Sequence, residues 1–249
     1  MMIDLILSGQ CRSYKKAWEW YNKSLFSNKD HTYRFFGHTW IDKNTENKLD
    51  DVVNTYSQNV SSCRINFSRF ENPIKRREDV EKKFQDYSRE FPAWNTYCMY
   101  YSMAEAFKCY DDFYVSGTIT IRSRWDFALN LPVDEIVNLY SQFDRGKIFV
   151  PSDRMTPNHD FCADMFAFGS PVIMVNSYPS TLEMLKFHQN AGVPMIGEDM
   201  LAAKLKMSGL IGKHMVYVDM HNHFPPGKYN GNYHSIIRDD FTDFNQLRN

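Results

Sequence analysis

Short apolar runs alternate with helical spacing along the chain, and this alternation predicts strands and helices in turn. Residues 2–7 form an apolar run that Ser8 and Gly9 close, which is typical of a buried strand followed by a tight turn. Ser13 can cap a helix that continues to residue 25, and residues 32–38 form a second strand-like run. A strand, a helix and another strand in this order predict a parallel sheet with right-handed crossovers.

The rest of the chain continues the same alternation. Further strands are expected at residues 63–67, 117–121, 147–150, 164–168 and 214–220, and helices at residues 49–56, 95–107, 133–143, 179–189 and 198–207. The stretch 72–83, within the polar region 42–90, is expected to be mobile, with a solvated helix start at the mixed-charge run 75–79. The tail from residue 221 onward is polar and rich in Gly, Pro and aromatic residues, and is expected to form a loop that folds over another part of the molecule.

No repeat, low-complexity tract or Pro/Ser linker divides the chain. Its 249 residues are enough to bury a substantial core without disulfides or a structural metal. We therefore expect a single α/β domain over residues 1–249, with a mostly parallel, Rossmann-like central sheet flanked by helices.

Charge and cysteine usage exclude several classes of protein. The formal net charge is -1, from 29 basic and 30 acidic side chains, so the chain lacks the basic field that holds a nucleic-acid backbone. The five cysteines are irregularly spaced without a Cys-x-x-Cys, which favours reduced thiols in a cytoplasmic protein over a disulfide framework or a zinc knot. No apolar run approaches the roughly 20 residues of a membrane span, and residues 1–9 lack the basic segment of a signal peptide.

The first group of residues suited to chemistry follows the first predicted strand. Ser8, Gly9, Gln10 and Arg12 lie where open α/β sheets bind ligands. Gly9 allows close approach of the backbone, and the Arg12 guanidinium suits a phosphate or a base edge. An ordinary turn with a surface arginine explains the same pattern. Neither G-x-G-x-x-G nor a Walker loop is present, so the pattern does not support a dinucleotide or P-loop site.

A second group is Arg122, Arg124 and Asp126, which directly follows the strand expected at 117–121. The Asp126 carboxylate can ligate a hard divalent ion, which would bridge the phosphates of a nucleotide and stabilise the leaving group. An Arg–Asp ion pair that closes a turn is the alternative interpretation.

Further carboxylates occur in the second half of the chain. Asp164 can accept hydrogen bonds from sugar hydroxyls, and Gly169 would let a sugar ring pack closely, although Asp160 or Asp164 can equally cap a turn. Glu198 and Asp199 stand at a predicted helix start, where helix capping explains them without function. The alternative is that one of them is a general base.

Histidines 214, 221, 223 and 234 lie in and after the last predicted strand. His221 and His223 would share one face of an extended segment, but no third ligand follows at a spacing typical of zinc. One of these histidines, or His234, can complete a metal or diphosphate site from the tail. A solvent-facing side chain is the alternative for each.

Taken in order, these segments resemble a family of small bacterial and viral, phage-type glycosyltransferases of the GT-A fold. The matching segments are the opening Ser-Gly-Gln-Cys-Arg-Ser at 8–13, the strand ending His-Thr-Trp at 38–40, the helix 95–103, the segment 110–126 that ends Arg-Ser-Arg-Trp-Asp, the Asp-to-Ser stretch 160–170, and the acidic pair 198–199. One departure is that Arg124-Trp125-Asp126 stands where such enzymes usually carry Asp-x-Asp.

The resemblance implies a hexosyltransferase that uses a UDP-sugar, with UDP-glucose expected, and an unidentified glycan, lipid or protein acceptor. It implies a nucleotide-binding half at 1–130 and a donor-sugar and acceptor half at 131–249. The residues implied are Ser8, Gly9, Gln10, Arg12, Tyr101, Arg122 and Arg124 for the nucleotide, Asp126 with His234 for Mn²⁺ or Mg²⁺, Asp164 and Gly169 for the donor sugar, and Asp199, Glu198 and Asp164 for catalysis.

Two other functions remain open from the sequence. A non-catalytic module that binds a glycan or a protein on a GT-A-like fold would explain the missing second aspartate and the high aromatic content, since aromatic rings stack on sugars. A methyltransferase also needs a parallel sheet, but it predicts a Gly-rich turn after the first strand, where this chain has one glycine.

Overall fold

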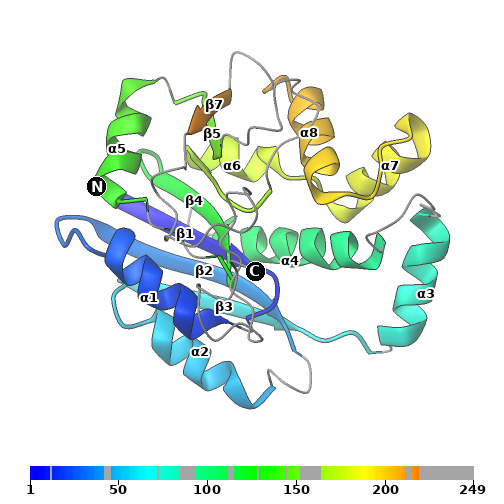
Figure 1. Ribbon diagram of the computed structural model, residues 1–249, viewed down its shortest axis with the longest axis horizontal. Helices are drawn as coiled ribbons and strands as arrows, with labels where there is room; N and C mark the ends of the chain where they lie inside the picture. The colour runs from blue at the N-terminus through cyan, green and yellow to red at the C-terminus, as the bar shows by residue number, and fades with distance from the viewer. Residues whose placement is uncertain are drawn as a thin grey trace, which may run out of the picture.

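The computed structural model describes residues 1–11, 13–41, 46–71, 73–84, 93–111, 115–127, 129, 131–143, 145–151, 164–210 and 215–218. Within these residues, a sheet of seven strands lies between two layers of helices (Figure 1). The strands follow the order β3-β2-β1-β4-β6-β5-β7 across the sheet. This one sheet spans both halves of the chain.

The central strands are almost continuously apolar because helices cover both of their faces. The strands are β1 (Met2–Ser8), β2 (Thr32–Trp40), β3 (Ser62–Ser68), β4 (Ile119–Arg124), β5 (Ile148–Pro151), β6 (Ala167–Gly169) and β7 (Met215–Val218). β6 is antiparallel to both β4 and β5, whereas the other neighbours are parallel. The mostly parallel sheet predicted from the sequence is therefore confirmed.

The helices divide between the two faces and bury two separate apolar clusters. One face carries α1 (Tyr14–Ser24), α2 (Leu49–Tyr56) and α5 (Val133–Gln142). The other carries α3 (Pro73–Phe84), α4 (Ala93–Asp111), α6 (Pro171–Ser177), α7 (Thr181–Ala191) and α8 (Gly197–Met207). A short 3-10 helix, η1 (Glu46–Lys48), precedes α2.

A buried ion pair crosses β1 and β2 in the middle of the sheet. The Arg34 guanidinium donates to both carboxylate oxygens of Asp4 at 2.7 Å, and the two residues are register partners. The hydrogen bond to Asp4 raises the pKa of Arg34. A shift in the β1–β2 register would separate the two buried charges and leave each without its partner, which is costly. The ion pair therefore favours this register.

Several elements differ from the sequence-based expectation. The stretch 72–83 is not a mobile segment, since residues 73–84 form α3, whose Val80 and Phe84 are one turn apart and are buried against α4. The strand expected at 164–168 is limited to Ala167–Gly169, and α6 was not predicted. The polar tail from residue 221 lies outside the described residues.

β4 also continues beyond its predicted end, so that Arg122 and Arg124 belong to the strand and do not follow it. The strand can continue through them because β1 pairs with β4 along the whole length of β4, up to the last register partners, Ser8 and Arg124. Among the described residues, no helix is both long enough and apolar enough to cross a membrane.

Candidate active site

The strand order reverses between β1 and β4. The chain builds outward from β1 to β2 and β3 on one side, and β4 lies on the other side of β1. In open α/β sheets such a reversal leaves a crevice at the carboxyl ends of the two strands, where ligands bind. Ser8 pairs with Arg124 there, so the predicted groups at residues 8–10 and 122–126 are brought together.

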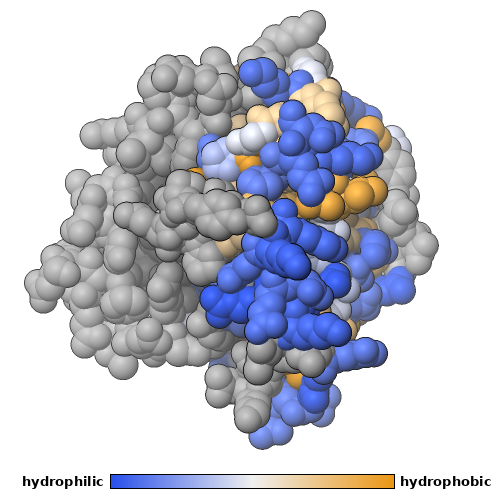
Figure 2. All heavy atoms as spheres, turned by 90° about the vertical axis from the view of Figure 1, so that its right-hand side faces the viewer, coloured by the Kyte–Doolittle hydropathy of each residue, from blue (hydrophilic) through white to orange (hydrophobic). Residues whose placement is uncertain are grey.

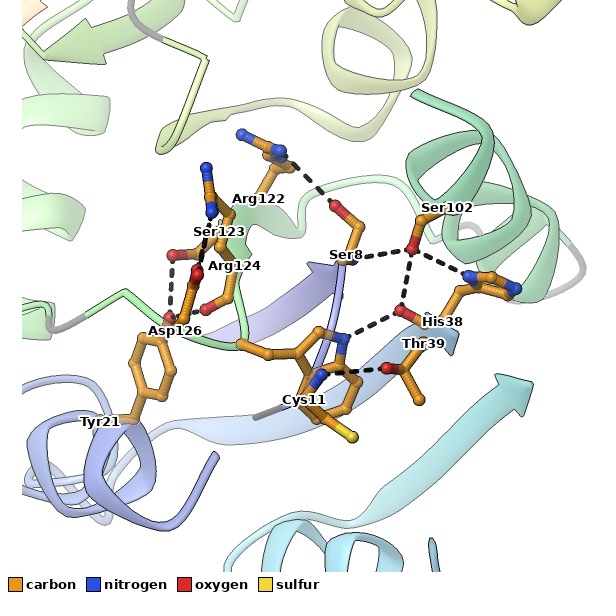
Figure 3. Close-up of polar contacts among 12 residues, drawn as sticks. Ser8, Cys11, Tyr21, His38, Thr39, Ser102, Arg122, Ser123, Arg124 and Asp126 are labelled. Carbon is orange, nitrogen blue, oxygen red and sulfur yellow. Dashed lines mark hydrogen bonds and ion pairs between the residues drawn. The ribbon is translucent and has the colours of Figure 1, made fainter. Parts of the chain in front are cut away.

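The turn after β1 is held in place by hydrogen bonds that its N–H groups donate to other elements (Figure 3). Gly9 has a φ of 106°, a conformation that favours glycine, and its N–H donates to Ser102 Oγ of α4 at 2.7 Å. The N–H of Cys11 donates to Thr39 Oγ1 of β2 at 3.1 Å. The turn therefore depends on the positions of β2 and α4.

His38 of β2 connects this turn to the core. Its Nδ1 lies 2.8 Å from Ser102 Oγ and its Nε2 lies 2.8 Å from Ser68 Oγ of β3. Ser102 donates its single hydroxyl proton to the His38 carbonyl oxygen at 3.1 Å, so Nδ1 must be the protonated nitrogen and Nε2 accepts from Ser68. Burial, followed by the positive charge of Lys108, lowers the pKa of His38 to about 4, which keeps the ring neutral.

Two aromatic side chains hold the carboxyl end of β4. The Trp125 indole N–H donates to the His38 carbonyl oxygen at 2.9 Å, and its ring lies over Gly37, where a Cβ would approach Cζ2 to 2.8 Å. On the other side, the Tyr21 hydroxyl bonds Ser123 Oγ at 2.8 Å and the Arg124 carbonyl oxygen at 2.9 Å. These contacts determine where Arg124 and the turn after it are placed.

Arg124 and Asp126 form a bidentate ion pair in this turn (Figure 3). Arg124 Nε and Nη2 donate to the two Asp126 oxygens at 2.8 and 2.9 Å. The two side chains are 26% and 16% exposed, so the pair is partly accessible at the sheet edge where the crevice is expected. The ion pair that the sequence left open as an alternative is therefore present.

Carboxylates from two other segments act electrostatically on this pair. Burial opposes the charge on Arg124, but Asp126, Asp164 and Glu198 together raise its pKa. Burial raises the pKa of Glu198 to about 7, and the negative charges of Asp164 and Asp199 add to the effect, while Arg124 opposes it. Asp164 and the acidic start of α8 therefore lie within electrostatic reach of the end of β4.

Gly197 allows Asp164 to sit against the first turn of α8. A Cβ at Gly197 would collide with the Asp164 carboxylate and would lie 2.9 Å from Met99 Cε. The helix start is held in turn by α4, since the Tyr100 hydroxyl donates to the Gly197 carbonyl oxygen at 2.5 Å. A helix N-terminus favours a nearby negative charge, which suits the position of Asp164.

Arg122 is fully buried on the same face of β4 as Arg124, beneath the crevice. Its Nη2 lies 3.5 Å from Ser8 Oγ, and its guanidinium carbon lies 5.4 Å from the centre of the Tyr178 ring. Within the described part of the chain, its Nε and Nη1 have no hydrogen-bond partner. Buried arginines normally have partners for all of these donors. Because two donors of Arg122 have none among the described residues, its positive charge under the site is only partly balanced by them.

The remaining predicted residues are placed as follows. Tyr101 is half-buried on α4, where its ring packs 5.0 Å from the Trp40 ring, beside the Ser102 contact to the turn. Gly169 is not part of the site, because it pairs with Thr120, deeper in the sheet than Arg122, and packs against the Lys147 carbonyl oxygen. Arg12, Asp160, His214, His221, His223 and His234 lie outside the described residues.

Sequence reasoning assigned no role to His38, Ser102, Trp125 or Tyr21, although these side chains hold the two loops in place. A polar residue next to an apolar run was the available signal, since His38 directly follows Phe35, Phe36 and Gly37 in a buried strand. The sequence does not show which serine faces that histidine, because Ser102 is separated from it by 64 positions.

Within the described ranges, no group of three or more His, Cys, Asp or Glu side chains is placed to hold a metal ion. Both Asp126 oxygens accept from Arg124. A protein-only metal cage is therefore not formed by the described side chains.

No protein-family model matches the sequence, and no curated protein matches it. Among solved structures, the chain is similar to galactosyltransferase LgtC in complex with donor and acceptor sugar analogues, at 9% identity, covering 88% of this chain and 74% of that chain with a TM-score of 0.51. An active-site mutant of LgtC matches at 11% identity, 88% and 73% coverage and the same TM-score of 0.51. Mouse xyloside xylosyltransferase 1 gives 10% identity, 88% and 86% coverage and a TM-score of 0.46. At such identities the likeness to LgtC concerns architecture alone, and it confirms the predicted GT-A-like α/β fold.

Proposed function

We propose that the protein transfers a hexose from a nucleotide diphosphate sugar, with UDP-glucose as the expected donor, to a separate acceptor. The observation that carries the proposal is the convergence at the strand-order reversal. There the Gly9 turn, the Arg124–Asp126 pair, Asp164 and the acidic start of α8 come together at one edge of the sheet. Such an arrangement offers both donors for phosphate and acceptors for sugar hydroxyls.

In this proposal the nucleotide lies along the turn after β1. Gly9 and Gln10 are half-exposed there, and Tyr101 offers a half-buried ring on the adjacent turn of α4. Arg12 is proposed to contribute from the same turn. Arg124 faces the diphosphate, and Arg122 supplies positive potential from below. Asp164 accepts hydrogen bonds from the donor sugar.

Charge balance favours a divalent cation in this site. The described groups comprise two guanidinium groups, Arg122 and Arg124, against the carboxylates of Asp126, Asp164 and Asp199, with Glu198 titrating near pH 7. A diphosphate adds further negative charge, so it requires additional positive charge to bind. Mg²⁺ commonly uses one or two protein carboxylates together with substrate phosphates. Asp126 would hold Mn²⁺ or Mg²⁺, with His234 as a proposed second ligand, and the ion would stabilise the leaving phosphate.

Glu198 is the proposed general base for an inverting transfer. Since only its ionised form accepts a proton, the rate should rise with pH through an apparent pKa of about 7. Glu198→Gln should lower the rate by about 10²–10⁴-fold and remove this limb of the profile. The pH dependence of kcat/KM for nucleotide release measures both effects.

Asp199→Asn provides the matched control for this assignment. Because the Asp199 charge helps to raise the pKa of Glu198, its loss should move the limb to lower pH while most activity remains. An unchanged pH limb in Glu198→Gln would show that another group titrates.

The proposal as a whole is tested by incubating the protein with a panel of nucleotide sugars, with and without Mn²⁺, and measuring release of free nucleotide. Saturable UDP binding with slow hydrolysis of UDP-glucose is expected. Glycan binding without any nucleotide binding would instead support the non-catalytic module.

A further inference from the structure

A groove that shares no lining residue with the site at β1 and β4 lies between α3, α4 and α7. Its volume is about 210 Å³. Val80 and Phe84 of α3 and Tyr97 of α4 form a buried apolar floor, and Leu182 and Leu185 of α7 form the opposite wall. Figure 2 looks onto this side of the molecule, where a hydrophobic strip runs between hydrophilic surfaces.

The rim of this groove is charged and comes from one face of α3. Arg76, Asp79 and Lys83 are spaced three and four residues apart, so they line the same side of the helix. Arg76 Nη2 donates to the Tyr97 hydroxyl at 2.8 Å, and its guanidinium carbon lies 5.7 Å from the centre of that ring. Arg76 is therefore held at the mouth, and Lys83 has no ion-pair partner within the described ranges.

The wall from α7 does not neutralise these cations. Glu183, the acidic residue of its first turn, caps the helix through Ser180 and pairs with Lys204 of α8 at 2.5 Å. The groove thus presents two cations and one carboxylate above an apolar floor. Such a surface complements an apolar group that ends in a negative charge.

The size of the groove restricts its occupant further. A volume of about 210 Å³ corresponds to roughly seven water-sized groups. This accommodates a stretch of one hydrocarbon chain and is smaller than the roughly 300–1,000 Å³ typical of drug-sized ligands. We propose that this groove binds the hydrocarbon chain of an anionic amphiphile, with the phosphate or similar head group at Lys83 and Arg76.

This site is independent of the proposed transferase activity, because its lining residues come from helices and none belongs to the crevice at β1 and β4. It can therefore be tested without any nucleotide sugar. Decyl phosphate, below its micelle concentration, is titrated into the full chain by calorimetry. Decanol and decyltrimethylammonium serve as neutral and cationic probes of the same chain length.

Decyl phosphate is expected to bind at one site, at least about tenfold more tightly than either other probe. Lys83→Glu should weaken it by about tenfold, because it replaces an attraction by a repulsion, whereas Lys82→Glu on the next, exposed position of α3 should leave it unchanged. Leu182→Ser should weaken binding by about fivefold. Met207→Ser, which alters a side chain of similar exposure (62% against 60%), should have no effect.

These paired variants change exposed side chains, so the fold is retained in all four. Equal losses in Lys82→Glu and Lys83→Glu would overturn the proposal, as would binding of decyltrimethylammonium that matches decyl phosphate. Absence of saturable decyl phosphate binding would also overturn it.

Discussion

Replacing Asp126 by alanine is expected to abolish turnover of the nucleotide sugar while leaving the fold nearly as stable as before. The carboxylate lies at the carboxyl end of β4, where it orients Arg124 through two hydrogen bonds and is the proposed ligand of the divalent ion. Removing one such electrostatic group from a site costs about 10²–10³-fold in kcat. Release of free nucleotide from UDP-glucose measures the loss.

Thermal unfolding separates this effect from damage to the fold. The Arg124 and Asp126 side chains are 26% and 16% exposed, so water can replace the lost carboxylate, and the melting temperature should change far less than on breaking a fully buried pair. Asp50→Ala, at an exposed position of α2 far along the chain, is the control and should retain full turnover. Normal turnover in Asp126→Ala would remove both the metal-site proposal and the role of the ion pair.

Gly197→Ala is expected to impair the site by moving Asp164. The added Cβ would collide with the Asp164 carboxylate and lie 2.9 Å from Met99 Cε, so the first turn of α8 or the carboxylate must shift. Overpacking of this kind costs about 1–3 kcal/mol. A displacement of about 1 Å at a positioning group lowers the rate by about 100-fold. Urea unfolding and nucleotide release measure the two effects on one preparation.

Gly192→Ala distinguishes lost stability from lost positioning. Gly192 ends α7 with a φ of 64°, and no atom lies within 4 Å of an added Cβ there. Alanine at this position costs about 1–2 kcal/mol through backbone strain alone. It should therefore destabilise the protein about as much as Gly197→Ala while the rate per folded molecule stays unchanged. Equal rate losses in both variants would indicate that stability, and not the position of Asp164, controls activity.

The groove between α3, α4 and α7 and the crevice at β1 and β4 share helix α4. Tyr97 forms part of the groove, and Tyr101, one turn later, lies beside the crevice, with 6.2 Å between the ring centres. The two proposed sites are thus adjacent on one rigid element but use different side chains. Calorimetry with decyl phosphate and nucleotide release with UDP-glucose report on them separately.

Local patterns along the chain were sufficient for most of the secondary structure. The apolar run at 2–7 and the helix at 49–56 correspond to β1 (Met2–Ser8) and α2 (Leu49–Tyr56), because strand and helix periodicity and turn residues act over a few neighbouring positions. The placement of residues 8–10 and 124–126 at one edge also followed from the sequence. Carboxyl ends of neighbouring parallel strands always meet at the same edge of a sheet.

Only the tertiary structure decided which side chains of these segments contact one another. The sequence by itself determined that polar and charged groups come near the carboxyl ends of two strands. It did not decide that Arg122 and Arg124 belong to β4, that Asp126 pairs with Arg124, or that Asp164 rests on Gly197. It also did not show that β6 runs antiparallel, which carries Gly169 into the sheet and leaves Asp164 at the crevice. These features depend on contacts between residues far apart in the chain, whose energies are set by packing and charge in three dimensions and leave no periodic trace in the sequence.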